Sequence, residues 1–227
     1  MIAIHEKFIA LALPVMVATV CWISPCVAND VAVRPIGVYA EIDIQLTSAA
    51  VQTLSSGSSA DKAKVIATVQ GNAKEYAPPA FYALSKALFD EGQKDEGAFW
   101  FYAGQLRGRF DANRCADASA REAIDVLNDE YGTPINQYMF QRPRNLAKLI
   151  DRVVDWDKKT PHNYDPRWIN LHGMNAMTAA MSGKVPTNAA ASMSIPSSQW
   201  AEIEEQTRAD YLSGFKEAMA QLKSQKN

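Results

Sequence analysis

The feature of this sequence that most constrains its fold is the helical spacing of its apolar residues. Between residues 143 and 157, leucine, isoleucine and valine recur at intervals of three and four, as one buried helix face requires. A second stripe of this kind runs from Trp200 to Leu222. Only residues 38–46 alternate with the period of a strand, and a single strand without a partner is not stable. We therefore expect an all-α fold, in which this segment is a helix that continues towards Leu54.

Prolines, glycines and capping residues predict where the other helices begin and end. Proline is favoured in the first turn of a helix, and glycine is favoured just after the last turn. On these signals we expect helices over residues 60–76, 79–91, 96–109, 119–131, 143–157, 168–182 and 196–221, with a stop at Gly132 and a mobile loop over residues 183–195. Helices joined by three or four residues must lie antiparallel. The expected architecture is an irregular bundle of stacked antiparallel helical hairpins.

Residues 1–28 have the three parts of a secretory signal peptide. Lys7 and the α-amino group form a weakly positive front, an apolar run begins at Phe8, and small residues end at Ala28. The alternative is an uncleaved membrane anchor, because this run approaches the roughly 20 residues that span a bilayer. We favour cleavage near Ala28, since the apolar core is short and ends in a cleavage-like site. The mature protein would then be periplasmic or secreted, with no further attachment to the membrane.

Composition limits what the mature chain can bind. Removing residues 1–28 leaves about 199 of the 227 residues, which we expect to form a single helical domain over residues 29–227. The formal net charge is −2, and no polybasic patch occurs. Nucleic-acid binding lacks its electrostatic footprint, and anionic membranes gain no strong attraction.

The cysteines divide between the signal segment and the mature domain. Cys21 and Cys26 leave with the signal, so Cys115 remains alone and cannot form an intramolecular disulfide. A single cysteine in an exported protein is either buried or pairs between chains. We favour burial, because a free cysteine is among the most buried residue types.

Residues 79–109 arrange large and small side chains in the order of a tight helical hairpin. The large residues are Phe81, Leu84, Leu88 and Phe101, and the small ones are Ser85, Gly97 and Gly104, with Gly92 at the turn. This order resembles one tetratricopeptide or Sel1-type hairpin. The resemblance covers about 30 residues, the closing proline of the tetratricopeptide pattern is replaced near Arg109, and no second copy recurs at a fixed period. An ordinary helical hairpin is the alternative.

What the resemblance implies is an interaction scaffold that carries no catalytic residue. Small exported helical proteins of this type include immunity proteins, which neutralise periplasmic toxins delivered by neighbouring bacteria. The mechanism expected of such a protein is occlusion, in which a helix face covers the active cleft of the toxin.

Motifs for catalysis, metals and cofactors are absent from the sequence. It contains no nucleophile elbow, no phosphate-binding loop and no dinucleotide fingerprint. A zinc site would need three or four closely spaced ligands, whereas the mature chain has only His162 and His172. Nothing local supports Cys115 as a nucleophile with either histidine as its base. We therefore expect no catalytic residue, no metal site and no small-molecule cofactor.

Two clusters contain the residue types that dominate the centres of protein interfaces, namely exposed aromatic side chains and arginine. We expect another protein to be bound by the following residues: Tyr138, Phe140, Arg142, Arg144, Arg167 and Trp168. The second cluster, residues 162–168, either locks two helices together by stacking arginine on an aromatic ring or lines a groove. We favour the lock. A third aromatic run, residues 99–102, surrounds a helix axis and is expected in the core, with Arg107 or Arg109 reaching the surface.

Two functional hypotheses from different classes follow. The first is an exported helical scaffold that binds another protein and has no enzymatic activity. The alternative is a hydrolase of envelope material that uses carboxylates and histidine near residues 162–168. The hydrolase needs a deep pocket in which His162 or Asp165 meets another carboxylate. A shallow face that includes Tyr138, Phe140 and Arg142 would favour binding.

Overall fold

The computed structural model describes residues 34–185 and 193–224, which belong to one unit of the chain, and these residues confirm the all-α fold. No strand occurs in these two ranges, where the extended backbone forms only an isolated antiparallel bridge between Cys115 and Ser194. The α-helices are α1 (Gln45–Ser56), α2 (Ser59–Gly71), α3 (Pro78–Asp90), α4 (Lys94–Arg114), α5 (Glu122–Phe140), α6 (Pro143–Lys159), α7 (Met174–Ser182) and α8 (Trp200–Ser224). The 3₁₀ helices are η1 (Gly37–Tyr39), η2 (Ala73–Glu75), η3 (Ala118–Arg121), η4 (Pro166–His172) and η6 (Ser197–Gln199).

The predicted signal peptide and most of the predicted mobile loop lie outside the described residues. Of that loop, residues 186–192 are not described. Within the described ranges, no helix combines the length and the apolar character needed to cross a bilayer.

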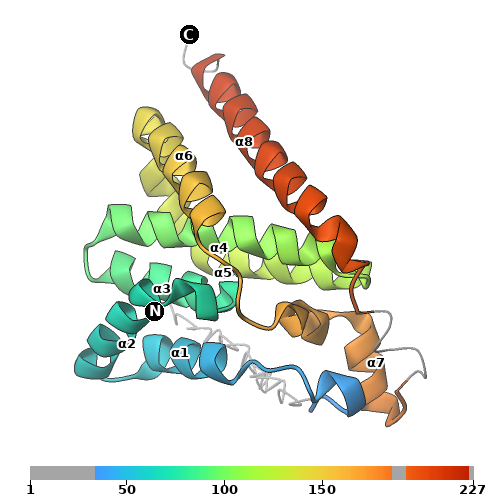
Figure 1. Ribbon diagram of the computed structural model, residues 1–227. Helices are drawn as coiled ribbons and strands as arrows, with labels where there is room; N and C mark the ends of the chain where they lie inside the picture. Colours follow the sequence, from blue (N-terminus) through green and yellow to red (C-terminus); the bar gives the residue numbers. More distant parts are fainter. Residues whose placement is uncertain (1–33, 186–192, 225–227) are drawn as a thin grey trace, which may run out of the picture. The chain divides into compact units, whose positions relative to one another are not determined.

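Helix α4 is the central element of the fold (Figure 1). Helix α3 packs along one side of α4, and helices α6 and α8 pack against its other side. Helix α5 contacts α3, α4 and α6, whereas α1 and α2 pack on α3. The core therefore forms around α4, and the segments that follow α6 return to it through η4 and α8.

The α3–α4 hairpin is tight because small residues lie where its two helices meet. A Cβ atom added to Gly97 would lie 2.7 Å from the backbone oxygen of Ser85, so only glycine allows this approach. A Cβ at Gly104 would lie 3.1 Å from the ring of Tyr82. Gly92 supplies the positive φ of 85° that the turn requires. The hairpin and the role of its small residues are confirmed.

The aromatic run at residues 99–102 lies in the core, as predicted. All four side chains are buried, although they point in different directions around α4. Trp100 packs edge-on against Trp156 of α6, with 5.4 Å between the ring centroids, and Tyr102 packs against Phe215 of α8 at the same distance. A helix that is aromatic on several sides is stable only when other helices cover it on several sides.

Five predicted helix boundaries were wrong. The helix over residues 60–76 ends at Gly71, and the one over residues 168–182 is divided into η4 and α7. Residues 38–46 are not one helix, because η1 is followed by an irregular segment and α1 begins only at Gln45. The second hairpin helix does not end near Arg109 but continues to Arg114. Gly108 does not break it, because this glycine serves packing: a Cβ there would lie 2.7 Å from Cδ1 of Ile124. Helix α5 passes through Gly132 and Pro134 instead of stopping. Gly132 serves packing, because a Cβ there would lie 2.8 Å from the ring of Phe101.

Candidate functional site

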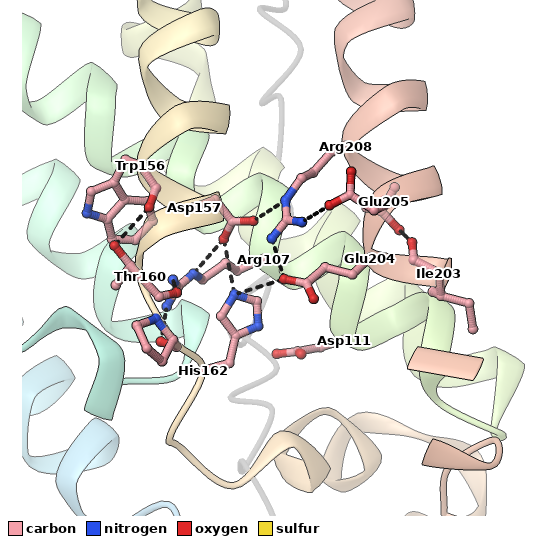
Figure 2. A network of polar contacts seen from close by, with 12 residues as sticks. Arg107, Asp111, Trp156, Asp157, Thr160, His162, Ile203, Glu204, Glu205 and Arg208 are labelled. Carbon is pink, nitrogen blue, oxygen red and sulfur yellow. Dashed lines mark hydrogen bonds and ion pairs between the residues drawn. The ribbon is translucent and has the colours of Figure 1, made fainter. Parts of the chain in front are cut away.

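A buried carboxylate, Asp157 at the end of α6, joins three helices (Figure 2). Its Oδ1 accepts hydrogen bonds from Nε of Arg107 on α4, at 2.8 Å, and from Nε2 of His162, at 3.1 Å. Its Oδ2 accepts a hydrogen bond from Nε of Arg208 on α8, at 2.9 Å. Asp157, Arg107 and Arg208 are all buried, whereas His162 is half-buried. We call these four residues the Asp157 junction.

The guanidinium group of Arg107 has further partners because α6 ends beside it. Its Nη2 donates to the carbonyl oxygen of Thr160 at 2.5 Å, and its Nη1 donates more weakly to that of Pro161 at 3.5 Å. The ring of Trp156 lies 4.4 Å from the guanidinium carbon, which is the geometry of a cation–π contact. A fully buried arginine is tolerated only with such a complete set of partners.

Two glutamates on α8 surround the other guanidinium group, as Figure 2 shows. Arg208 donates to Glu204 through Nη2 and to Glu205 through Nη1, the latter at 2.6 Å. The Oε1 atom of Glu204 also lies 3.8 Å from Nε2 of His162. His162 therefore lies between two carboxylates, one from α6 and one from α8.

The electrostatics of the junction keep Asp157 ionised. Burial by itself would raise the pKa of this carboxyl group, but the hydrogen bond from His162 and the charge of Arg107 outweigh burial and lower the pKa to about 2. A general acid needs a pKa near the working pH. Asp157 is thus unsuited to donate a proton near neutral pH.

A cavity of about 310 Å³ adjoins the junction and is lined by His162, Glu204, Arg114, Phe110 and Trp200, among others. It meets part of the requirement stated for the hydrolase, since His162 contacts another carboxylate there. Asp165 does not take part. Its carboxylate forms an ion pair with Arg167 at 2.6 Å and accepts a hydrogen bond from the backbone of Asp43.

Asp157, His162 and Glu204 could also hold a metal ion, because their ligand atoms lie within 4.8 Å of one another. Nitrogen and carboxylate oxygen are donors that zinc accepts. However, guanidinium groups already occupy both oxygens of Asp157, and a cation would have to displace them. We therefore interpret the three residues as partners in an ion-pair network.

A second buried carboxylate, Asp111 on α4, holds the segment 162–168. Its Oδ2 accepts hydrogen bonds from the hydroxyl group of Tyr164, at 2.9 Å, and from the indole N–H of Trp168, at 2.6 Å. Its Oδ1 pairs with Arg114. The segment thus locks onto α4 through a shared carboxylate, because Arg167 pairs with Asp165 instead of stacking on a ring, and its Trp168 also lines a groove.

The cluster at the end of α5 forms an exposed surface. Phe140 is 40% exposed, and Arg142 and Arg144, which follow it in the chain, are also exposed. The guanidinium group of Arg142 lies 4.1 Å above the ring of Tyr138 and donates to the backbone oxygen of that residue at 2.8 Å. The hydroxyl group of Tyr138 donates to Asp95 at 2.8 Å. We call Tyr138, Phe140, Arg142 and Arg144 the aromatic–basic face.

The structure does not bring all six predicted partner-binding residues together. Trp168 is only 2% exposed and lines a cavity beside Leu127 of α5, while Arg167 is half-buried next to it. Tyr138 lies eleven residues further along α5 than Leu127, which is about 16 Å at 1.5 Å per residue. The aromatic–basic face and the segment 162–168 are therefore separate features.

The residues of the Asp157 junction were missed, apart from His162, because no motif connects them. A weaker signal was present in the sequence. Asp157 follows Val153 and Val154 by four and three residues, so it continues the apolar stripe of α6. A charged residue at a stripe position is predicted to be buried, and a buried charge requires a partner.

Cys115 at the end of α4 is buried, as we favoured. Its thiol group donates to the side-chain oxygen of Asn170 at 3.3 Å, and burial raises the pKa of the thiol. A buried cysteine with a raised pKa is a poor nucleophile.

Compared with known proteins, the chain matches no family model, no curated protein and no solved structure. Its function must therefore be argued from the chemistry of its own sites.

Proposed function

We propose that this chain is an exported helical scaffold without enzymatic activity, and that it binds another protein through the aromatic–basic face. The observation that carries the proposal is the stack of Arg142 on Tyr138 at the end of α5, where Phe140 is 40% exposed. Arginine and aromatic residues dominate the energetic centres of protein interfaces. A partner would bury the ring of Phe140 and pair its acidic groups with Arg142 and Arg144.

The face is also ordered before any partner binds. The guanidinium group of Arg142 is held by the ring and the backbone oxygen of Tyr138, and the hydroxyl group of Tyr138 is held by Asp95. The ring of Phe89 packs edge-on against Tyr138, with 5.7 Å between the centroids. Side chains that are already fixed lose less conformational entropy on binding, and this raises affinity.

The concrete version of the proposal is an immunity protein that occludes a periplasmic toxin. It is supported by the resemblance of residues 79–109 to a Sel1 or tetratricopeptide hairpin and by the signal-like segment 1–28. Occlusion needs a rigid face and no chemistry. An acidic active cleft, or an acidic border around one, would suit Arg142 and Arg144.

The experiment is a pull-down from periplasmic extract under native conditions, followed by measurement of affinity for the captured protein. The double variant Phe140→Ala/Arg142→Ala is expected to bind at least tenfold more weakly, because it removes the exposed ring and the stacked cation. Met181→Ala is the matched control, since Met181 is 76% exposed on α7 and lies outside the face. A chain that captures no partner, or a double variant that binds as well as the control, would contradict the proposal.

The second candidate is a hydrolase of envelope material. It is favoured by one observation, that His162 lies between Asp157 and Glu204 at a cavity of about 310 Å³. It ranks second because the oxygens of Asp157 are already bound by two guanidinium groups. The test is hydrolysis of isolated envelope polysaccharide by the protein and by His162→Gln. If the protein hydrolyses the polysaccharide and His162→Gln does not, although it keeps its helical content, the hydrolase would become the first candidate.

A further inference from the structure

A groove of about 610 Å³ lies between α1 and α5. Both helices pack against α3, and Pro79 at the start of α3 contributes to the lining between them. Trp168 and Leu171 of η4 also line the groove. It is distinct from the aromatic–basic face, which lies at the other end of α5.

The walls of this groove are helix faces with regular spacing. Helix α5 contributes Ala123, Val126 and Leu127, and helix α1 contributes Thr47 and Val51. These positions differ by three and four residues, so each set forms a ridge along one side of its helix. A trough between two helices that rest on a third is the place where another helix packs, with its own ridge in the trough.

Acidic residues stand on the α5 wall at either end of its apolar patch. Glu122 and Glu130 both line the groove and are exposed, and neither forms an ion pair with another described residue. They are eight residues apart on one helix, which corresponds to about 12 Å along its axis. Val126 lies midway between them and is 63% exposed.

We propose that this groove binds an amphipathic helix of a partner protein, with an apolar stripe flanked by two basic residues seven or eight positions apart. The apolar stripe would cover Val126 and Leu127, and the two cations would pair with Glu122 and Glu130. Helices commonly bind in apolar grooves by side chains at positions i, i+3, i+4 and i+7. The acidic border selects a basic partner, whereas the aromatic–basic face suits an acidic one, so the two surfaces recognise different chemistry.

The test uses designed peptides and fluorescence anisotropy with the full chain. A helical peptide of about 16 residues, or four turns, carries a leucine stripe with flanking lysines, and its twin carries glutamates instead. The lysine peptide should bind at least tenfold more tightly than the glutamate peptide. The double variant Glu122→Lys/Glu130→Lys should reverse this preference.

A substitution at the centre of the groove tests the site itself. Val126→Arg should weaken binding of the lysine peptide at least tenfold, and it should leave the fold intact because Val126 is largely exposed. Leu46→Arg is the matched control, since Leu46 is 51% exposed on the same helix as Thr47 but does not line the groove. Circular dichroism would verify that both variants are folded.

Three outcomes would overturn the inference. The first is a lysine peptide that does not bind, or that binds no better than its glutamate twin. The second is a Val126→Arg variant that binds as tightly as the Leu46→Arg control. The third is a groove that binds a small cationic amphiphile, such as cetyltrimethylammonium below micellar concentration, but binds no peptide. Val126→Arg would abolish this binding, and the groove would then be a site for a small molecule. None of these variants alters residues 138–144, so the proposal for the aromatic–basic face stands or falls separately.

Discussion

Replacing Asp157 by asparagine should destabilise this protein more than any conservative surface change. The side chain keeps its shape but loses the charge to which Arg107, His162 and Arg208 donate hydrogen bonds. Arg208 retains Glu204 and Glu205 as partners. Arg107 retains two carbonyl oxygens and the ring of Trp156 but becomes a buried cation without a counter-charge.

The magnitude follows from two estimates. The pKa of Asp157 is lowered to about 2 from an ordinary value near 3.8, and at 1.36 kcal/mol per unit this difference corresponds to about 2 kcal/mol of stability above pH 4. The variant also leaves Arg107 buried and unpaired, and removing one partner of a buried ion pair typically costs about 3–5 kcal/mol. Because the pKa difference measures only part of the loss, we expect the free energy of unfolding to fall by about 3–5 kcal/mol.

The assay is equilibrium unfolding in urea, followed by circular dichroism. Asp90→Asn is the matched control, because Asp90 forms an exposed ion pair with Lys86 at 2.8 Å, and such pairs contribute less than about 1 kcal/mol. The double variant Arg107→Met/Asp157→Leu should be less destabilised than Asp157→Leu alone, since it removes the orphaned cation. A loss in Asp157→Asn no larger than that in Asp90→Asn would refute the reasoning.

Two further predictions concern the same core. Because the pKa of Asp157 is lowered in the folded protein, the stability that its ionised form contributes is present above pH 4 and is lost as the pH falls towards 2. The free energy of unfolding of Asp157→Asn should therefore change less than that of the unaltered protein over this interval. A drop of equal size in both proteins would contradict the role given to Asp157. Gly97→Ala should destabilise the protein by about 2 kcal/mol or more, since the new Cβ would lie 2.7 Å from the backbone oxygen of Ser85. Gly71→Ala is the control: its Cβ would meet nothing within 4 Å, so the change should be neutral or stabilise by up to about 1 kcal/mol. Unfolding in urea measures both variants, and equal effects would contradict the packing argument.

The sequence predicted the helices and the core well because both depend on local spacing. The apolar stripe of α6 is buried at Leu146, Leu149, Ile150, Val153 and Val154, as its period of three and four requires. The hairpin was predictable because its glycines and Ser85 have a steric role that few other residues can fill. Helix boundaries were predicted wrongly where a glycine that usually ends a helix serves packing instead. Gly132 allows a ring to approach α5, so it does not end the helix.

The candidate site was less predictable because its members are far apart in the chain. Arg107, Asp157 and Arg208 are separated by about 50 residues each, and no local pattern states which helices pack together. At the end of α5, Phe140, Arg142 and Arg144 are exposed and Tyr138 is half-buried, whereas Trp168 is drawn inward by Asp111. Their role in binding a partner stays a prediction.

The Asp157 junction and the aromatic–basic face lie at opposite ends of α6. The face continues into the helix start at Pro143, and the junction holds the helix end, 14 residues or about 21 Å away. If the junction is purely structural, Asp157→Asn should lower the fraction of folded molecules but leave the affinity of each folded molecule for its partner unchanged. If the junction is instead a catalytic centre, the same variant should lose activity beyond the loss of folded protein. Measuring folding, binding and hydrolytic activity on one sample of Asp157→Asn therefore separates a scaffold from an enzyme.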